Sequence, residues 1–166
     1  MFPLLKIILG LIVVFFLVHI LRTWQLEHSA NQKLFASGTI PNPLPDGLYN
    51  GSVSGHTFSW LGKKFFATTS RGINIFTPLD IKLSNGVNQN STTTEKYPFK
   101  TSLGKGLRDK TLDVFQIDYN IPANPFWLRP ILDEIVEITP GHYLGKLQAR
   151  FIPGFPFTLS YFELKK

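Results

Sequence analysis

Residues 1–22 form an almost uninterrupted apolar stretch, in which only Lys6 and His19 are strongly polar before Arg22. A helix of about 20 residues, rising 1.5 Å per residue, crosses a hydrocarbon core of ~30 Å. Lys6 lies near one end, where its ammonium group can reach the lipid headgroups, and Arg22 and Trp24 suit the opposite interface. The pattern therefore predicts an N-terminal transmembrane helix.

Two other interpretations of this stretch are a cleaved signal peptide and a buried helix. Ala30 offers a cleavage position, but His28 stands where a small residue is required. Basic residues are almost equally divided between the two flanks, so they do not fix the orientation. We expect an uncleaved single-pass anchor that places the rest of the chain on the outer (periplasmic, lumenal or extracellular) face.

Residues 23–46 join this anchor to the body of the protein. The first part, TWQLEHSANQKLFAS, contains neither Pro nor Gly, and Gly38 and Pro41 then stop a helix. The next part, PNPLPDG, has three prolines and an Asp-Gly pair, which exclude regular structure. We expect a short juxtamembrane helix, a Pro-rich linker and then a β-barrel domain over residues 47–166.

Beyond Gly47, short runs of β-branched and aromatic residues alternate with Gly, Pro, Asn and Ser, which is the pattern of strands and turns. Turns are predicted at Asn85–Gly86, Pro140–Gly141 and Pro153–Gly154, with a turn of helix near residues 124–131. Sequential hairpins favour an antiparallel meander barrel over a sandwich, because closure removes exposed edges. The chain is thus predicted to be mainly β, with additional pairing near Thr92–Lys100 and strands over Leu48–Val53, Thr57–Phe66, Ile73–Phe76, Leu79–Leu83, Thr111–Tyr119, Leu132–Thr139, Tyr143–Phe151 and Phe157–Leu164.

Alternation along three of these strands predicts which side chains face inward. In the segment LDEIVEI, Glu134 shares the apolar and therefore inner face with Val136, whereas Asp133 is expected at the surface. In YLGKLQARF, Tyr143 and the residues alternating with it face in, and Lys146 lies on the opposite face. In HTFSWLGKKFF, without a bulge, one face carries His56, Phe58, Trp60, Gly62, Lys64 and Phe66.

Composition excludes several classes of function. The chain has no Cys, which excludes disulfides and thiolate chemistry, and its His residues lack metal-ligand spacing with carboxylates. The net charge of +6 comes without a nucleic-acid-binding signature, so we expect contact with membrane lipid rather than with nucleic acid. Nucleotide-binding and hydrolase motifs are missing, and we expect neither a metal nor a cofactor.

The loop YNIPANPFWLRP presents an adjacent aromatic pair, Phe126 and Trp127, with Arg129 close enough in sequence to stack on Trp127. It is interpreted either as a lid that packs its own aromatic side chains or as a gate for a hydrophobic ligand or a membrane-facing wedge.

The segment SWLGKKF together with the ending DEIVEITPGHYLGK…FTLSYFEL resembles small lipocalin-like barrels of the G-x-W-x-G type. Trp60 and Gly62 match that motif, and Phe58 occupies the position of its first glycine. The resemblance implies an apolar cavity for a lipid-like or pigment-like molecule.

The resulting hypothesis is a membrane-anchored, lipocalin-like protein that binds a hydrophobic small molecule at the membrane surface. One alternative is an enzyme that acts on a hydrophobic substrate, with Glu134 as acid or base and His142 or Asp118 assisting. Another is an interaction module whose barrel is filled by its own Phe side chains. The predicted ligand-binding residues are Glu134, Trp60, Phe58, Trp127, Phe126 and Tyr143.

Overall fold

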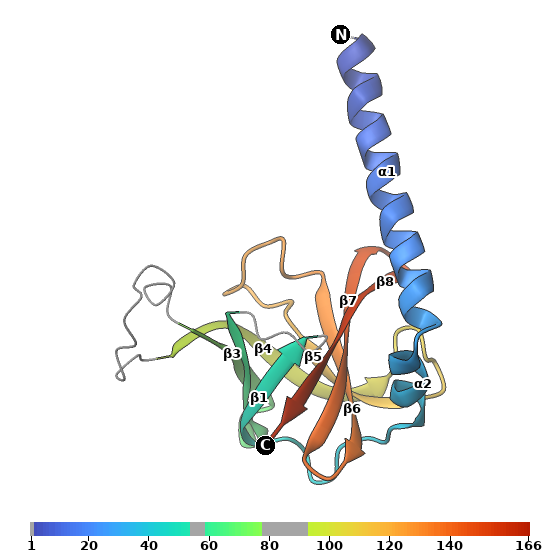
Figure 1. Ribbon diagram of the computed structural model, residues 1–166. Coiled ribbons are helices and arrows are strands. Elements are labelled where there is room, and N and C mark those ends of the chain that lie inside the picture. Colours follow the sequence, from blue (N-terminus) through green and yellow to red (C-terminus); the bar gives the residue numbers. More distant parts are fainter. Residues whose placement is uncertain (1, 54–58, 78–92) are drawn as a thin grey trace, which may run out of the picture.

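The computed structural model describes residues 2–53, 59–77 and 93–166 and contains a closed antiparallel barrel (Figure 1). Each strand pairs with the next, and β1 pairs with β8, so closure leaves no edge among these eight strands. The predicted mainly β meander barrel is therefore confirmed. The strands are β1 (Gly47–Val53), β2 (Trp60–Phe66), β3 (Arg71–Phe76), β4 (Thr94–Lys105), β5 (Asp113–Asp118), β6 (Ile131–Thr139), β7 (His142–Ile152) and β8 (Phe155–Lys165).

Most predicted strands coincide with observed ones. The additional pairing expected near Thr92–Lys100 is strand β4, which continues to Lys105. The turns at Gly141 and Gly154 join β6 to β7 and β7 to β8, and both glycines have positive φ (73° and 78°), which favours glycine. Residues 126–130 form turns rather than helix. The predicted strand Leu79–Leu83 and the Asn85–Gly86 turn lie outside the described residues.

Two helices precede the barrel. Helix α1 (Phe2–Glu27) rises away from it, and helix α2 (Ala30–Ser37) lies against its wall (Figure 1). The hydroxyl of Ser29 accepts a hydrogen bond from the backbone N–H of Gln32 and so caps the start of α2, and Gly38 caps its other end. The predicted juxtamembrane helix is thus the end of α1 together with α2.

The outer face of the β6–β7 region is covered by these helices instead of by water. Phe35 of α2 is fully buried among Val114, Val136, Leu144 and Tyr161. A fully buried Phe side chain contributes roughly 2–3 kcal/mol through the hydrophobic effect. The helical segment is therefore part of the folded body.

This cover explains why the predicted inner face of β6 is wrong. Asp133 and Ile135 face the barrel interior, whereas Glu134 and Val136 face outward under the helices and the loop 106–112. Strand alternation identifies the core face only when the other face meets solvent, and β6 is buried on both faces. On β7 the predicted faces hold: Tyr143 faces in and Lys146 faces out, although Lys146 is fully buried.

A β-bulge between Trp60 and Gly62 shifts the alternation in β2. Gly62 has φ of +136°, and a Cβ there would lie 2.0 Å from the carbonyl oxygen of Tyr49, so only glycine fits. Lys63 and Phe65 therefore join Trp60 on the inner face, where a regular strand would have placed Lys64.

Candidate cavity and its buried ion pair

The barrel interior is divided into a filled half and a hollow half. Aromatic side chains of Tyr49, Phe65, Phe115 and Tyr143 fill the end near the C-terminus, with hydroxyl oxygens of Tyr49 and Tyr143 3.5 Å apart. Burial raises the pKa of Tyr143 above its ordinary value. This half is packed core.

The hollow half holds a cavity of about 340 Å³. It lies toward the last residues of β1 and β3 and the first residues of β2 and β6. The loop 119–130 and the β7–β8 turn belong to the same end, which is the side from which α1 rises (Figure 1). The apolar lining consists of Val53, Trp60, Phe76, Tyr97, Trp127, Leu128, Ile131, Leu147 and Phe162.

Apart from Ser160, the polar part of the cavity wall is a buried ion pair with two hydrogen-bonding partners. The Lys63 ammonium lies 2.9 Å from Asp133 Oδ2 and donates to Asn74 Oδ1 at 2.9 Å and to the Tyr119 hydroxyl. The Tyr119 hydroxyl also lies 3.2 Å from Asp133 Oδ2. We call Lys63, Asn74, Tyr119 and Asp133 the polar floor; they come from β2, β3, the residue that follows β5, and β6.

Aromatic rings surround the Lys63 ammonium. It lies 5.1–5.4 Å from the ring centroids of Trp60, Phe99, Tyr119 and Phe162, which is within range for cation–π attraction. Burial lowers the pKa of Lys63, while the carboxylate of Asp133 acts in the opposite direction. The floor therefore combines a neutralised charge pair with a low-dielectric, apolar surrounding.

Tyr119 is held in its neutral form. Burial and the nearby Asp133 carboxylate raise its pKa well above the ordinary value. A neutral Tyr hydroxyl can donate one hydrogen bond within the polar floor.

The structure brings some of the predicted ligand-binding residues together and separates others. Trp60 and Trp127 line the cavity. Phe126 is 81% exposed next to it, and Tyr143 lies in the filled half. Phe58 lies outside the described residues.

Glu134 lies on the outer side of the barrel wall, so the expectation that it faces the cavity is wrong. Its carboxylate accepts hydrogen bonds from the backbone N–H of Leu107 and, at 2.8 Å, from Gln148 Nε2. Burial raises the pKa of Glu134, although both hydrogen bonds oppose that shift. The assistants proposed for catalysis are engaged elsewhere: Asp118 pairs with Arg150 at 2.6 Å, and His142 with Glu163 at 3.0 Å.

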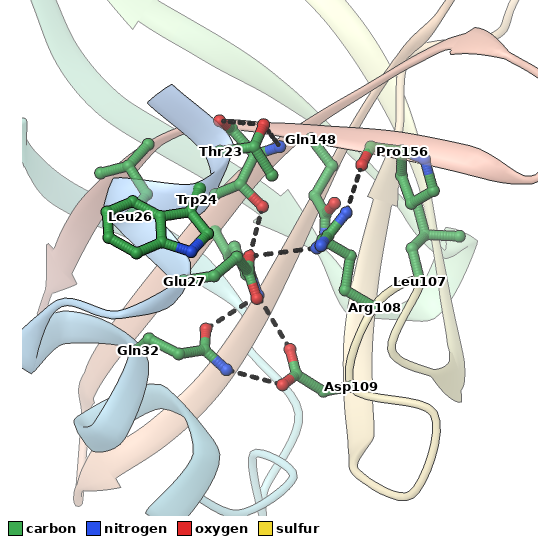
Figure 2. Close-up of polar contacts among 12 residues, drawn as sticks. Thr23, Trp24, Leu26, Glu27, Gln32, Leu107, Arg108, Asp109, Gln148 and Pro156 are labelled. Atoms are coloured by element: carbon green, nitrogen blue, oxygen red, sulfur yellow. Dashed lines mark hydrogen bonds and ion pairs between the residues drawn. The ribbon is translucent and has the colours of Figure 1, made fainter. Parts of the chain in front are cut away.

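A second polar cluster connects the helices to this outer wall (Figure 2). The Lys146 ammonium contacts Glu27 at 2.7 Å and Asp109 at 2.9 Å, and Gln32 donates to Asp109 at 2.6 Å. Arg108 lies 3.4 Å from Glu27 and donates to the Pro156 carbonyl. We call Glu27, Gln32, Asp109 and Lys146 the helix clamp, because they tie both helices to β7.

The residues of the polar floor were not predicted as a site. Without a bulge, Lys63 falls on the face of its strand opposite Trp60, and Asp133 was expected at the surface because the apolar face of its strand was taken as the inner one. Gly62 beside Trp60 was the available signal, since an isolated glycine in a strand often marks a bulge.

We predict strong energetic coupling between Lys63 and Asp133. Lys63→Met or Asp133→Leu alone leaves the partner as an unpaired buried charge, which typically costs about 3–5 kcal/mol in the free energy of unfolding. The double variant should lose at least about 2 kcal/mol less than the sum of the singles. Urea denaturation of the full chain in detergent measures this cycle.

The exposed pair Lys105–Asp113, 2.8 Å apart, is the matched control. Its coupling should not exceed about 1 kcal/mol, because solvent screens both charges. Additive losses at Lys63 and Asp133 would contradict the buried pairing.

Comparison with known proteins finds no matching family model and no matching curated protein. Among solved structures, the chain is similar to a protein from Thermomonospora curvata described by its crystal structure. The TM-score is 0.54 with 14% sequence identity, and the match covers 81% of this chain and 84% of the other. At that identity the likeness concerns the fold alone, and the lipocalin family stays a resemblance.

Proposed function

We propose that this protein is anchored in a membrane by α1 and binds a hydrophobic small molecule in the hollow half of its barrel. The observation that carries the proposal is the apolar cavity of about 340 Å³ with a single polar floor. Ligand pockets typically measure ~300–1,000 Å³ and combine apolar walls with a few placed polar groups. An eight-stranded barrel has room for one small ligand.

The membrane anchor is supported by the composition of α1 and by its attachment. Residues Pro3–Glu27 are long and apolar enough to span a bilayer. A signal sequence passes the same test, but cleavage near Ala30 would remove Glu27 from the helix clamp. It would also remove Thr23, whose hydroxyl accepts a hydrogen bond from the backbone N–H of Thr158 at 3.1 Å. Retention of α1 therefore agrees better with the packing.

Binding is favoured over catalysis and over a purely structural role. Lys63, Tyr119 and Asp133, which line the cavity, are engaged with one another by an ion pair and hydrogen bonds, and Glu134 points away from it. A barrel filled completely by Phe side chains would have no cavity, whereas the described residues of this barrel fill one end and leave the other hollow.

Filling the cavity should prevent binding. Leu147 lines it, and Leu147→Trp adds an indole ring to that space. We expect photolabelling of cavity residues by a diazirine-bearing dodecane to fall about tenfold in this variant, because the ligand and the indole compete for one volume. The full chain in phosphatidylcholine nanodiscs is irradiated, and adducts are mapped by mass spectrometry.

Two matched variants separate this effect from nonspecific ones. Leu103→Trp adds the same ring at a side chain that is 56% exposed, and Glu134→Gln removes the acid from the outer wall. Both should label like the parent chain. Equal labelling in Leu147→Trp, or no adducts at cavity residues in the parent, would overturn the proposed function.

A further inference from the structure

Five apolar side chains at the cavity end of the barrel are exposed. Phe126 and Trp127 belong to the loop 119–130, and the other three flank the β7–β8 turn. Exposed apolar clusters of this kind mark interaction surfaces. We call these residues the apolar rim: Phe126 (81% exposed), Trp127 (53%), Phe151 (43%), Ile152 (39%) and Phe155 (43%).

The rim lies beside the apolar part of α1. The ring of Phe151 is 6.4 Å from that of Phe15, and the ring of Phe157 is 6.1 Å from that of Phe16. Figure 1 shows the β7–β8 turn alongside α1, with the loop 119–130 on the same side of the barrel. The barrel therefore already lies against α1 at Phe15 and Phe16, where the apolar sequence of the helix continues toward Leu21.

The length of α1 then decides where the membrane must lie. The apolar run of α1 between the charged residue Lys6 and Phe15, residues 7–14, is about 12 Å long at 1.5 Å per residue. That is too short for a hydrocarbon core of ~30 Å. A spanning α1 must therefore place the level of Phe15 to Leu21, and the β7–β8 turn beside it, within the apolar layer.

We infer that the apolar rim is inserted in the bilayer, so that the cavity opens toward the acyl chains rather than toward water. The inference rests on the proposed membrane anchor and adds the barrel itself as a membrane-contacting surface. A hydrophobic ligand dissolved in the bilayer could then enter the cavity past Trp127, which both lines it and belongs to the rim.

Site-directed spin labelling tests this insertion. Because the sequence has no native Cys, each single-cysteine variant carries its label at one known position. Nitroxides are attached in turn at Phe155→Cys, Leu11→Cys and Leu103→Cys of the full chain in phosphatidylcholine vesicles. Relaxation by oxygen, which concentrates in the acyl layer, is compared with relaxation by a water-soluble nickel chelate. We expect labels at positions 155 and 11 to be relaxed mainly by oxygen, and the label at 103 mainly by nickel.

The possible results distinguish insertion of the apolar rim from the membrane anchor formed by α1. A label at Phe155→Cys relaxed mainly by nickel, while that at Leu11→Cys is relaxed by oxygen, overturns rim insertion and leaves the anchor intact. Nickel-dominated relaxation at both positions overturns both.

Discussion

Neutralising the ammonium of Lys63 inside the barrel is the constraint on which the rest of the structure depends. An unpaired buried ammonium costs several kcal/mol, so a carboxylate must face it. Asp133 meets that need from the opposite side of the interior, 2.9 Å away. Its inward position fixes the register of β6, which directs Glu134 and Val136 outward. Those residues are buried only because α2 and the loop 106–112 cover them.

Contacts on the outer wall of the barrel therefore stabilise the fold together with those of the interior. Lys146 is fully buried there and is neutralised by Glu27 and Asp109, one from α1 and one from the loop 106–112. Through these contacts the end of α1 is fixed to β7 and β8. A membrane-spanning α1 would thus hold the barrel in one orientation, with the cavity end toward the bilayer.

Much of this fold follows from local patterns in the sequence. The apolar N-terminal helix, the strand positions and the two Pro-Gly turns were predictable because each depends on neighbouring residues. The register of β6 was not, because its covering helix lies about a hundred residues away in the chain. The bulge at Gly62 likewise depends on close approach to the backbone of Tyr49. Consequently Trp60 and Trp127 were identified at the cavity, whereas Lys63, Asn74 and Asp133 were not.

Native mass spectrometry of the full chain, purified in detergent without added ligand, tests the central claim most directly. A barrel with one hollow half of about 340 Å³ should retain one small apolar molecule per chain when the detergent is removed in the gas phase. The account predicts a single adduct of stoichiometry one to one that is absent from the Leu147→Trp variant. A spectrum with only the bare chain, or with identical adducts in both proteins, would contradict it.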